Sequence, residues 1–529
     1  MAIDGMNGEP ALVDQAAVLA FLHQAESGMQ RVDTHASIVF LGRDRALKIK
    51  RGVRLPFLDY STLDRRRNAC EEELRVNRPF APQLYHRVVP ITREADGFAV
   101  DGDGAPVEWA VEMSRFDETQ GLDHLVSRQE IAPETATALA DVILAAHARE
   151  QAVDGANWIS SITDIIDGNT KRFRAVEGLA ASSIDLLDAR CHDDLAACQG
   201  LLRDRASTGF VRRCHGDLHL GNIVLIDDAP VLFDAIEFDP AIATTDILYD
   251  LAFPLMDLIR YGNAAAANTL FNRYMAESDD AHRDALSLVP LFLTLRAAIR
   301  ANVLFTKSEQ PGAHRHAAWH NAKHYFDLAI SLIQPAPPVM VAVGGLSGTG
   351  KSALSRAVAS LLAPAPGALI FRSDVIRKKL FGVPETERLP ASAYTPAVTV
   401  RVYEAMLNGA ERAAAQGCSV ILDAAFLREG ERATFAATGP VTTAHAGLFL
   451  TAERDVRLAR IAQRTHDASD ATASVAIQQE DFLVGPIDWP AVDANGSFEQ
   501  TLKGAIEALQ SRGVRTGETT NDTPLLRNR

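Results

Sequence analysis

The sequence lacks the paired cysteines that hold zinc or form a redox centre. Zinc sites and dithiol centres need ligands at close, regular spacing. No C-x-x-C occurs, and the cysteines are odd in number and scattered: Cys70, Cys191, Cys198, Cys214 and Cys418. His192 follows Cys191, but no second cluster of cysteine or histidine lies at ligand spacing. We therefore expect free thiols, no transition metal and a reducing compartment, the cytoplasm.

The sequence also lacks a secretory leader, a long apolar run and an excess of basic residues. The opening MAIDGMNGEPALVDQ carries an acidic residue where a signal peptide needs positive charge. The most apolar segments, such as 288–295 with its Pro290, fall short of the ~20 residues that span a bilayer. A formal net charge of −15 disfavours nonspecific binding to nucleic acid and to anionic lipid. These absences predict a soluble protein without a membrane or nucleic-acid partner.

The chain is long enough for more than one domain. Its 529 residues exceed one compact core, and 47% hydrophobic residues suffice to bury several. Three prolines within 334–338 cannot continue a helix and predict a domain boundary. Before this boundary, strand-like segments at 37–41 and 46–50 precede mostly helical sequence from Ala132, the order expected of a small strand-rich lobe followed by a helical lobe.

After the boundary, strand-like runs alternate with helical stretches. The runs lie at 339–343, 368–371, 419–422 and 446–450. Alternation of this kind is typical of a doubly wound parallel sheet with helices on both faces.

The clearest motif follows the first of these runs. Residues 345–352 read G-x-x-x-x-G-K-S, and a helical stretch comes next. The glycines let backbone N–H groups turn around phosphate oxygens at the positive end of the helix. In such a P-loop the lysine neutralises the β- and γ-phosphates and the serine holds Mg²⁺. We expect ATP and Mg²⁺ to be bound by Gly345, Gly348, Gly350, Lys351 and Ser352.

Two later strand ends supply carboxylates. Asp423 closes the run at 419–422 and is the candidate Walker B ligand of Mg²⁺, with a turn or N-cap aspartate as the alternative. Asp374 follows the run at 368–371, and Arg377 comes three residues later. A carboxylate there can accept the proton of an attacking hydroxyl, and the arginine can hold phosphate. The alternative is an N-cap aspartate with an i,i+3 ion pair.

Three arginines at helical spacing precede a polar loop at 465–472. Arg457, Arg460 and Arg464 fall on one helical face, and such residues can close over a triphosphate as a lid. A solvated basic face explains the same spacing equally well.

Together these residues resemble the small P-loop kinases that phosphorylate hydroxyl groups, among them gluconate-kinase-like enzymes, chloramphenicol phosphotransferases and polynucleotide 5'-kinases. The resemblance covers about residues 339–510. Its shared D-x-x-R, Asp374 and Arg377, implies that Asp374 is the general base and leaves the acceptor open.

A second constellation lies upstream. His215-Gly-Asp217-Leu-His-Leu-Gly-Asn222 is followed by an apolar run that ends at Asp234. The spacing H-x-D-x-x-x-x-N with a later aspartate is typical of the catalytic loop of protein kinases. There the first aspartate accepts the proton of the acceptor hydroxyl, and the asparagine and second aspartate hold Mg²⁺. Asp217, Asn222 and Asp234 are the candidates for these roles.

The motif H-G-D-L-H-x-x-N resembles the signature of aminoglycoside phosphotransferase-like kinases, with similarity over about 32–333. The resemblance implies a bilobal protein-kinase-like fold and a strand lysine in A-x-K, for which Lys48 is chosen and Lys50 is the rival. The ion-pair partner of this lysine comes from Glu71, Glu72 or Glu73, with Glu73 first. The chain departs from the G-x-G-x-x-G phosphate loop of protein kinases, since only Gly42 occurs at 34–42.

Further positions follow from the same resemblance. Residues 111–114 lie where the link between lobes presents backbone groups to adenine. Asp250 matches an architectural hydrogen-bonding position. Arg296 and Arg300, four residues apart, are expected on a solvated helix face rather than in an acceptor pocket.

The predicted fold class is thus α/β and α+β, with a bilobal kinase-like domain followed by a doubly wound P-loop domain. The expected limits are 1–333 for the first domain (lobes at about 31–113 and 114–333), 334–338 for the linker, 339–512 for the P-loop domain and 513–529 for a flexible tail. The predicted function is a bifunctional ATP-dependent kinase acting on hydroxyls of small molecules. The alternatives are an ATP-sensing regulator, and a nucleic-acid 5'-hydroxyl kinase in the P-loop domain.

Overall fold

The computed structural model describes residues 15–25, 29–34, 36–55, 58–278, 280–309, 315–464, 468–482 and 485–517. The chain divides into two compact units. The first comprises 1–128, 145–158 and 205–250, and the second comprises 129–144, 159–204 and 251–529. The predicted domain limits of 1–333 and 339–512 stay predictions.

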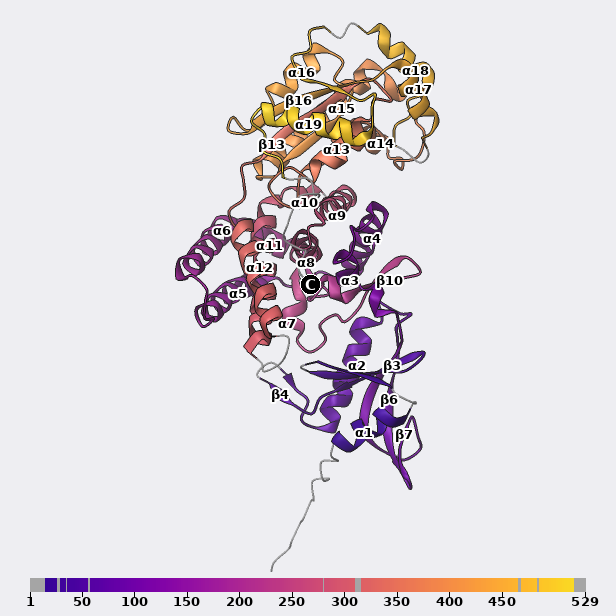
Figure 1. The fold of residues 1–529 in the computed structure, drawn as a ribbon, viewed down its shortest axis with the longest axis vertical. Coiled ribbons are helices and arrows are strands. Elements are labelled where there is room, and N and C mark those ends of the chain that lie inside the picture. Colours follow the sequence, from indigo (N-terminus) through magenta and orange to yellow (C-terminus); the bar gives the residue numbers. More distant parts are fainter. Residues whose placement is uncertain are drawn as a thin grey trace, which may run out of the picture. The chain divides into compact units, whose positions relative to one another are not determined.

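The first unit contains a six-stranded antiparallel sheet in the order β1-β2-β3-β8-β6-β7 (Figure 1). Its strands are β1 (Gln30–Asp33), β2 (Ser37–Leu41), β3 (Arg45–Lys50), β6 (Tyr85–Glu94), β7 (Gly97–Val100) and β8 (Ala105–Ser114). The segments at 37–41 and 46–50 are thus strands, as the sequence predicts. The short pair β4 (Arg54–Leu55) and β5 (Leu58–Asp59) follows β3.

Strand β3 sends alternate side chains to the two faces of this sheet. Leu47 and Ile49 pack in one core with helix α1 (Gln15–Ala25), whereas Ala46 packs in another with Cys70 of helix α2 (Leu63–Asn77). Because the side-chain period of a strand is two, Lys48 and Lys50 share the face of Ala46. The strand therefore directs both lysines toward α2.

The rest of the first unit holds the segment 214–234. Residues 214–222 connect strand β9 (Val211–Arg213) to the hairpin of β10 (Ile223–Ile226) and β11 (Ala229–Leu232), and Asp234 follows β11. Strand β12 (Thr244–Asp246) pairs with β9, and helix α7 (Pro240–Ala243) and α3 (Leu122–Val126) are short.

The second unit contains two parts, a set of helices and a parallel sheet. The helices, some of which also extend into the first unit, are α4 (Pro133–Arg149), α5 (Ala156–Arg174), α6 (Ala181–Ser207), α8 (Ile247–Arg260), α9 (Ala264–Glu277), α10 (Asp280–Arg283), α11 (Val289–Glu309) and α12 (Arg315–Leu332). Asn272 of α9 accepts the N–H of Ile370 (2.8 Å) and donates to the carbonyl of Ala368 (3.0 Å), so that its amide extends the edge of the parallel sheet.

Two expectations about the helices are wrong. Within the described ranges, Leu286–Glu309 is one stretch long and apolar enough to cross a membrane, well beyond the short run at 288–295, but two thirds of its apolar window is buried inside the protein. Arg296 is not on a solvated face: it is 4% exposed, and its guanidinium lies 4.5 Å from the ring centre of Phe253. Stacking on an aromatic ring lets a helix bury a guanidinium, which spacing alone does not reveal.

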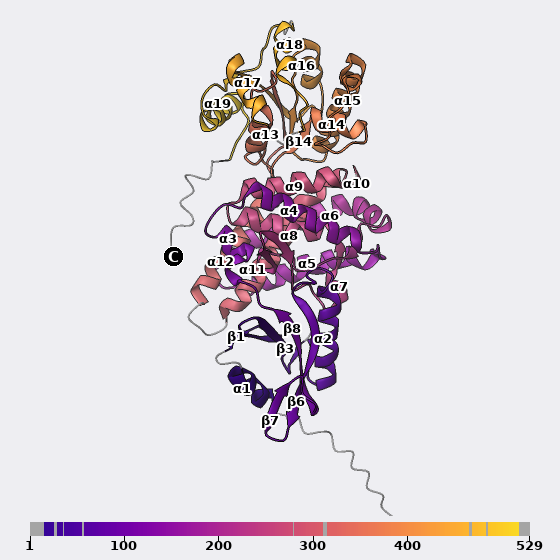
Figure 2. The same cartoon turned by 90° about the vertical axis from the view of Figure 1, so that its right-hand side faces the viewer.

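The parallel sheet has the order β14-β15-β13-β16-β17, which confirms a doubly wound α/β fold. Its strands are β13 (Val339–Gly345), β14 (Leu369–Arg372), β15 (Val420–Asp423), β16 (Ala444–Thr451) and β17 (Ala491–Asp493). Figure 2 shows α13 (Lys351–Ala359) and α19 (Phe498–Ser511) on one side of this sheet, and α14 (Ser373–Leu380) and α15 (Pro396–Ala415) on the other side. Helices α16 (Glu429–Ala436), α17 (Arg454–Ala462) and α18 (Ala473–Gln478) complete the domain.

The predicted tail at 513–529 is described only in part. Val514 is 2% exposed, and the N–H of Gly517 donates to the carbonyl of Leu361 at 2.8 Å. Residues 518–529 lie outside the described residues.

All five cysteines are free. Cys70, Cys191, Cys214 and Cys418 are buried, and Cys198 is partly buried.

Candidate functional sites

The first site is built around an ion pair between β3 and α2. Lys48 Nζ lies 2.6 Å from Glu73 Oε1, and Glu73 is fully buried. Of the three glutamates that the sequence leaves open, Glu73 alone faces this lysine, because Glu71 pairs with Arg67 and Glu72 pairs with Arg75 at the surface. Lys50 also contacts Glu73, through Oε2 at 2.7 Å. Both candidate lysines therefore share one carboxylate.

Asp234 also forms an ion pair with Lys48. Its Oδ1 is 2.5 Å from Lys48 Nζ, and its backbone has φ of +61°. The backbone N–H of Asp234 donates to Tyr85 Oη at 3.2 Å, which supports this unusual conformation. Burial alone would raise the pKa of Asp234, but the ammonium of Lys48 outweighs it and holds this pKa below its usual range. The carboxylate is therefore ionised at neutral pH.

The catalytic-loop residues meet beside it. Asn222 Nδ2 donates to the carbonyl of Asp217 at 2.9 Å and to Asp217 Oδ2 at 3.3 Å. His219 Nδ1 accepts the N–H of Gly221, so the ring proton lies on Nε2, 3.5 Å from Asp217 Oδ2. The Asp217 side chain is 41% exposed and open to a substrate. His215 is buried, which lowers its pKa, and its Nε2 donates to the carbonyl of Phe233 at 2.9 Å.

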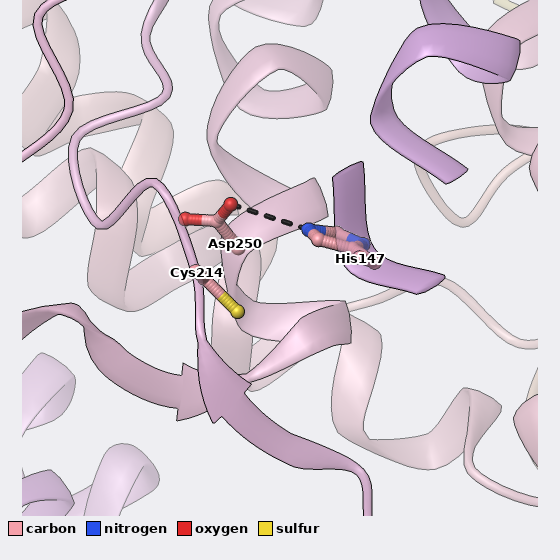
Figure 3. A group of neighbouring side chains, drawn as sticks. All are labelled: His147, Cys214 and Asp250. Carbon is pink, nitrogen blue, oxygen red and sulfur yellow. Dashed lines mark hydrogen bonds and ion pairs between the residues drawn. The ribbon is translucent and has the colours of Figure 1, made fainter. Parts of the chain in front are cut away.

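An aspartate behind the loop anchors it (Figure 3). Asp250 Oδ1 accepts the N–H of Gly216 at 2.9 Å, and Oδ2 lies 3.2 Å from His147 Nε2. Cys214 is close enough to complete a three-residue group of metal-ligand types, all buried. Since both carboxylate oxygens of Asp250 already have partners, we interpret the group as the anchor of the loop, in line with the architectural position that the sequence indicates for Asp250.

A cavity of about 310 Å³ joins these groups. Its polar lining includes Lys48, Asp217 and Asp234. Its apolar lining includes Val39, Ala46 and Met113, the last within the segment 111–114 where the sequence places the adenine-binding link. A cavity lined by apolar side chains together with a lysine and carboxylates has the character of a nucleotide site.

The second site surrounds the P-loop between β13 and α13. Ser352 Oγ donates to Asp423 Oδ2 at 2.5 Å, because β15 lies beside β13 and its end reaches the start of α13. Arg372 Nη2 donates to Ser352 Oγ at 3.2 Å, and its Nε is 3.4 Å from Asp423 Oδ2. Lys351 Nζ donates to the carbonyl of Leu346 at 3.0 Å. The predicted P-loop residues and Asp423 are therefore brought together.

Two titratable groups of this site have shifted pKa values. Burial, reinforced by the neighbouring Asp423 carboxylate, raises the pKa of Asp374. Burial lowers the pKa of Lys351, although Asp423 opposes this shift. An aspartate with a raised pKa beside a second carboxylate is typical of a group poised to accept a proton.

The predicted arginines take different places. Arg377 is 7% exposed, donates to the carbonyl of Ala393 at 2.7 Å and stacks on Tyr394. Arg460 Nη1 donates to the carbonyl of Thr349 in the P-loop at 3.4 Å, and the charge of Arg464 contributes to lowering the pKa of Lys351.

Both expectations for Arg457, a place on a lid and a place on a solvated basic face, are wrong. It is 2% exposed, pairs with Glu480, and its Nη1 donates to the carbonyl of Ser347 at 3.4 Å. Of the expected lid loop, residues 465–467 lie outside the described residues.

Sequence reasoning missed several residues that hold these sites. Arg372 bridges Ser352 and Asp423, and its position at the end of a strand was the available signal. The loop of Asp234, residues 233–239, is held by Asn77, which contacts Ala235, and by Glu237, which pairs with Lys50. No local motif marks Asn77 or Glu237. Gln479 accepts the N–H of Ser347 in the P-loop at 2.8 Å, from 132 residues away.

Comparison with known proteins supports the C-terminal assignment. The family model described as "AAA domain" matches residues 340–486. Uncharacterized proteins of Mycobacterium tuberculosis and Mycobacterium bovis are each 29% identical over 494 residues, which is 90% of this chain and 95% of theirs.

Two solved structures resemble separate parts of the chain. A gluconokinase from Sinorhizobium meliloti is 22% identical over 33% of this chain and 93% of its own, with a TM-score of 0.24. A choline/ethanolamine kinase family protein from Mesorhizobium loti is 13% identical over 61% of this chain and 99% of its own, with a TM-score of 0.36.

Proposed function

We propose that the chain is a bifunctional ATP-dependent phosphotransferase, in which each site moves the γ-phosphate of ATP to a hydroxyl of a small molecule. One observation carries the proposal: each site holds a lysine, a base-type aspartate and a further carboxylate within one cluster, Lys48 with Asp217 and Asp234 in the first and Lys351 with Asp374 and Asp423 in the second. Phosphoryl transfer needs these three functions and little covalent chemistry from the protein.

In the first site Asp217 is the base. It takes the proton of the acceptor hydroxyl as the new oxygen–phosphorus bond forms and the bond between the γ-phosphorus and the bridging oxygen of ADP breaks. Glu73 holds Lys48 in place, and Lys48 orients the phosphates. The carboxylate of Asp234 and the amide oxygen of Asn222 are the hard oxygen ligands that Mg²⁺ prefers, so the donor set fits this ion. When bound, Mg²⁺ offsets the negative charge of the phosphates.

In the second site Asp374 accepts the proton from the other acceptor. The backbone of Gly345, Gly348 and Gly350 surrounds the phosphates, and Lys351 neutralises them. Ser352 and Asp423 form an oxygen pair suited to Mg²⁺. Arg460 and Arg464 lie on the side of the P-loop and Lys351 and offset charge on the transferring phosphate, whereas Arg377 supports the acceptor side of α14.

The acceptors are sugars, polyols or aminoglycoside-like molecules in the cytoplasm. An aspartate base at each site suits a hydroxyl acceptor, and the P-loop domain shares its D-x-x-R with kinases of such substrates.

The test measures ADP formation by the full chain with Mg²⁺-ATP against sugars, polyols, aminoglycosides, nucleosides and 5'-hydroxyl oligonucleotides. We expect Asp217→Asn to lower one acceptor-dependent activity by about 10²–10⁴-fold, and Lys351→Ala to abolish a different one. The matched controls Asp228→Asn and Lys503→Ala change exposed residues and should keep both activities. If ATP binds but no acceptor stimulates turnover, the bifunctional kinase is excluded and an ATP-sensing regulator takes its place.

A further inference from the structure

The last residue of α2 clamps the backbone next to Asp234. Asn77 is fully buried, and its Oδ1 accepts the N–H of Ala235 at 2.7 Å while its Nδ2 donates to the carbonyl of the same residue at 3.1 Å. The amide thus satisfies both polar groups of one backbone residue, as a neighbouring strand would. Because Ala235 directly follows Asp234, this contact limits how far the Asp234 carboxylate can turn.

A second contact joins the same loop to β3 and α2. Lys50 is 1% exposed, and its Nζ lies 2.7 Å from Glu73 Oε2 and also contacts Glu237 Oε1. Glu237 is 8% exposed and accepts a further hydrogen bond from Tyr60 Oη at 3.4 Å. A buried lysine with two carboxylates is held far more firmly than a surface ion pair, because neither partner can exchange for water.

The two contacts act on opposite ends of one short segment. Asn77 holds residue 235 and Lys50 holds residue 237, while Lys48 joins Glu73 to Asp234, the residue just before this segment. In protein kinases, the position of the helix that carries the glutamate controls whether the lysine–glutamate pair forms. Here a movement of α2 would break the hydrogen bonds of Asn77 and the ion pairs of Lys50 together. Each of these losses would leave buried polar groups without partners.

We propose that Asn77 and the Lys50–Glu237 pair form a latch that holds α2 on the loop of Asp234, so that Lys48, Glu73 and Asp234 keep their arrangement without a separate activation step. The proposal rests on the proposed function, because it assigns these residues to the Mg²⁺-ATP site. Asn77 does not line the cavity, whereas Lys50 and Glu237 both line it and are held by their ion pair with each other. All three are positioning residues.

The test uses the full chain with Lys351→Ala, so that nucleotide binding reports the first site. A fluorescent ATP analogue is titrated over a range of Mg²⁺ concentrations. We expect Asn77→Ala and Glu237→Gln to raise the Mg²⁺ concentration for half-maximal binding by about tenfold or more, since supporting residues of metal ligands usually have effects of this size. Asn68→Ala, an exposed asparagine of the same helix, is the control and should leave the midpoint unchanged.

Three further variants separate the possible outcomes. The double variant Lys351→Ala, Lys48→Ala gives the baseline fluorescence. If Lys351→Ala alone gives no more nucleotide binding than this baseline, the proposed ATP site itself is absent. Lys50→Arg should restore the midpoint that Lys50→Met loses. If Glu237→Gln and the folded Asn77 variants lower the Tm but leave the Mg²⁺ midpoint at its original value, the residues serve folding alone and the latch is refuted. Glu237→Gln, which keeps the size of the side chain, decides the matter if Asn77→Ala does not fold.

Discussion

Asp374 lies in an environment that works against its own charge. It is packed near Asp423 at the end of the adjacent strand, and burial together with that carboxylate raises its pKa. A group that suits proton transfer is thus obtained at a cost in stability, as is common for active-site residues. The effect of Asp374 on the free energy of unfolding therefore depends on pH, with a sign that its raised pKa determines.

Between 3.8, the ordinary pKa, and the raised pKa of Asp374, the folded state binds more protons than the unfolded state. The free energy of unfolding therefore falls as the pH rises through this window, and it stays lowered above it. We expect Asp374→Asn to abolish the phosphotransfer that depends on Lys351 and to raise the Tm of the P-loop domain at neutral pH by about 2 °C or more. The measurement is a thermal scan at pH 7 and at pH 4, beside an activity assay.

Asp455→Asn provides a control of opposite sign. Asp455 is exposed in the first turn of α17, where a negative charge stabilises the helix, so its removal should lower the Tm slightly. A Tm of Asp374→Asn at or below that of the original protein would contradict the charge conflict described for Asp374.

At the scale of elements, the three successive glutamates of α2 should differ widely in their effect on stability. Glu73 is buried between Lys48 and Lys50, whereas Glu72 is partly exposed and pairs with Arg75. We expect Glu73→Gln to lower the free energy of unfolding by about 3 kcal/mol and Glu72→Gln by less than about 1 kcal/mol. Urea unfolding of both variants measures the difference.

The contribution of Glu73 to the free energy of unfolding depends on pH. Burial alone would raise the pKa of Glu73, but the two lysines outweigh it and hold the pKa below 4.5. The stabilisation by Glu73 is therefore present above pH 4.5 and is lost as the pH falls through the lowered pKa. The stability gap between the original protein and Glu73→Gln should narrow in acid. An equal gap at pH 3 and pH 7 would show that packing rather than charge makes Glu73 important.

The motif residues could be predicted from the sequence, but much of their support could not. Asp217, Asn222, Lys351 and Asp423 belong to local patterns whose spacing reflects one turn or one strand end. Asn77 contacts a residue 158 positions away, and no local spacing encodes that contact. The choice among the glutamates required the rotation of α2 against β3, which follows from the two cores on either side of the sheet. Tertiary packing therefore decided what local patterns left open.

At the scale of the whole molecule, charge separates the small-molecule function from the nucleic-acid alternative. The net charge of −15 should prevent retention on heparin and salt-dependent binding of single-stranded oligonucleotides. We expect elution from heparin in the void volume at about 0.1 M salt, close to the ionic strength at which the Debye length is ~10 Å. Strong retention that falls with salt would favour a 5'-hydroxyl kinase for the P-loop domain.

The buried thiols give the protein internal reporters of its own opening. Burial raises the pKa of Cys70 and of Cys418 to about 12, so neither reacts while its surroundings are closed. Cys70 lies in the first unit and Cys418 in the second. The rate at which each thiol is alkylated, measured peptide by peptide by mass spectrometry, can therefore follow the local opening of each unit separately in one sample, without any added dye or mutation. Ligands for the two sites should then slow the alkylation of different cysteines.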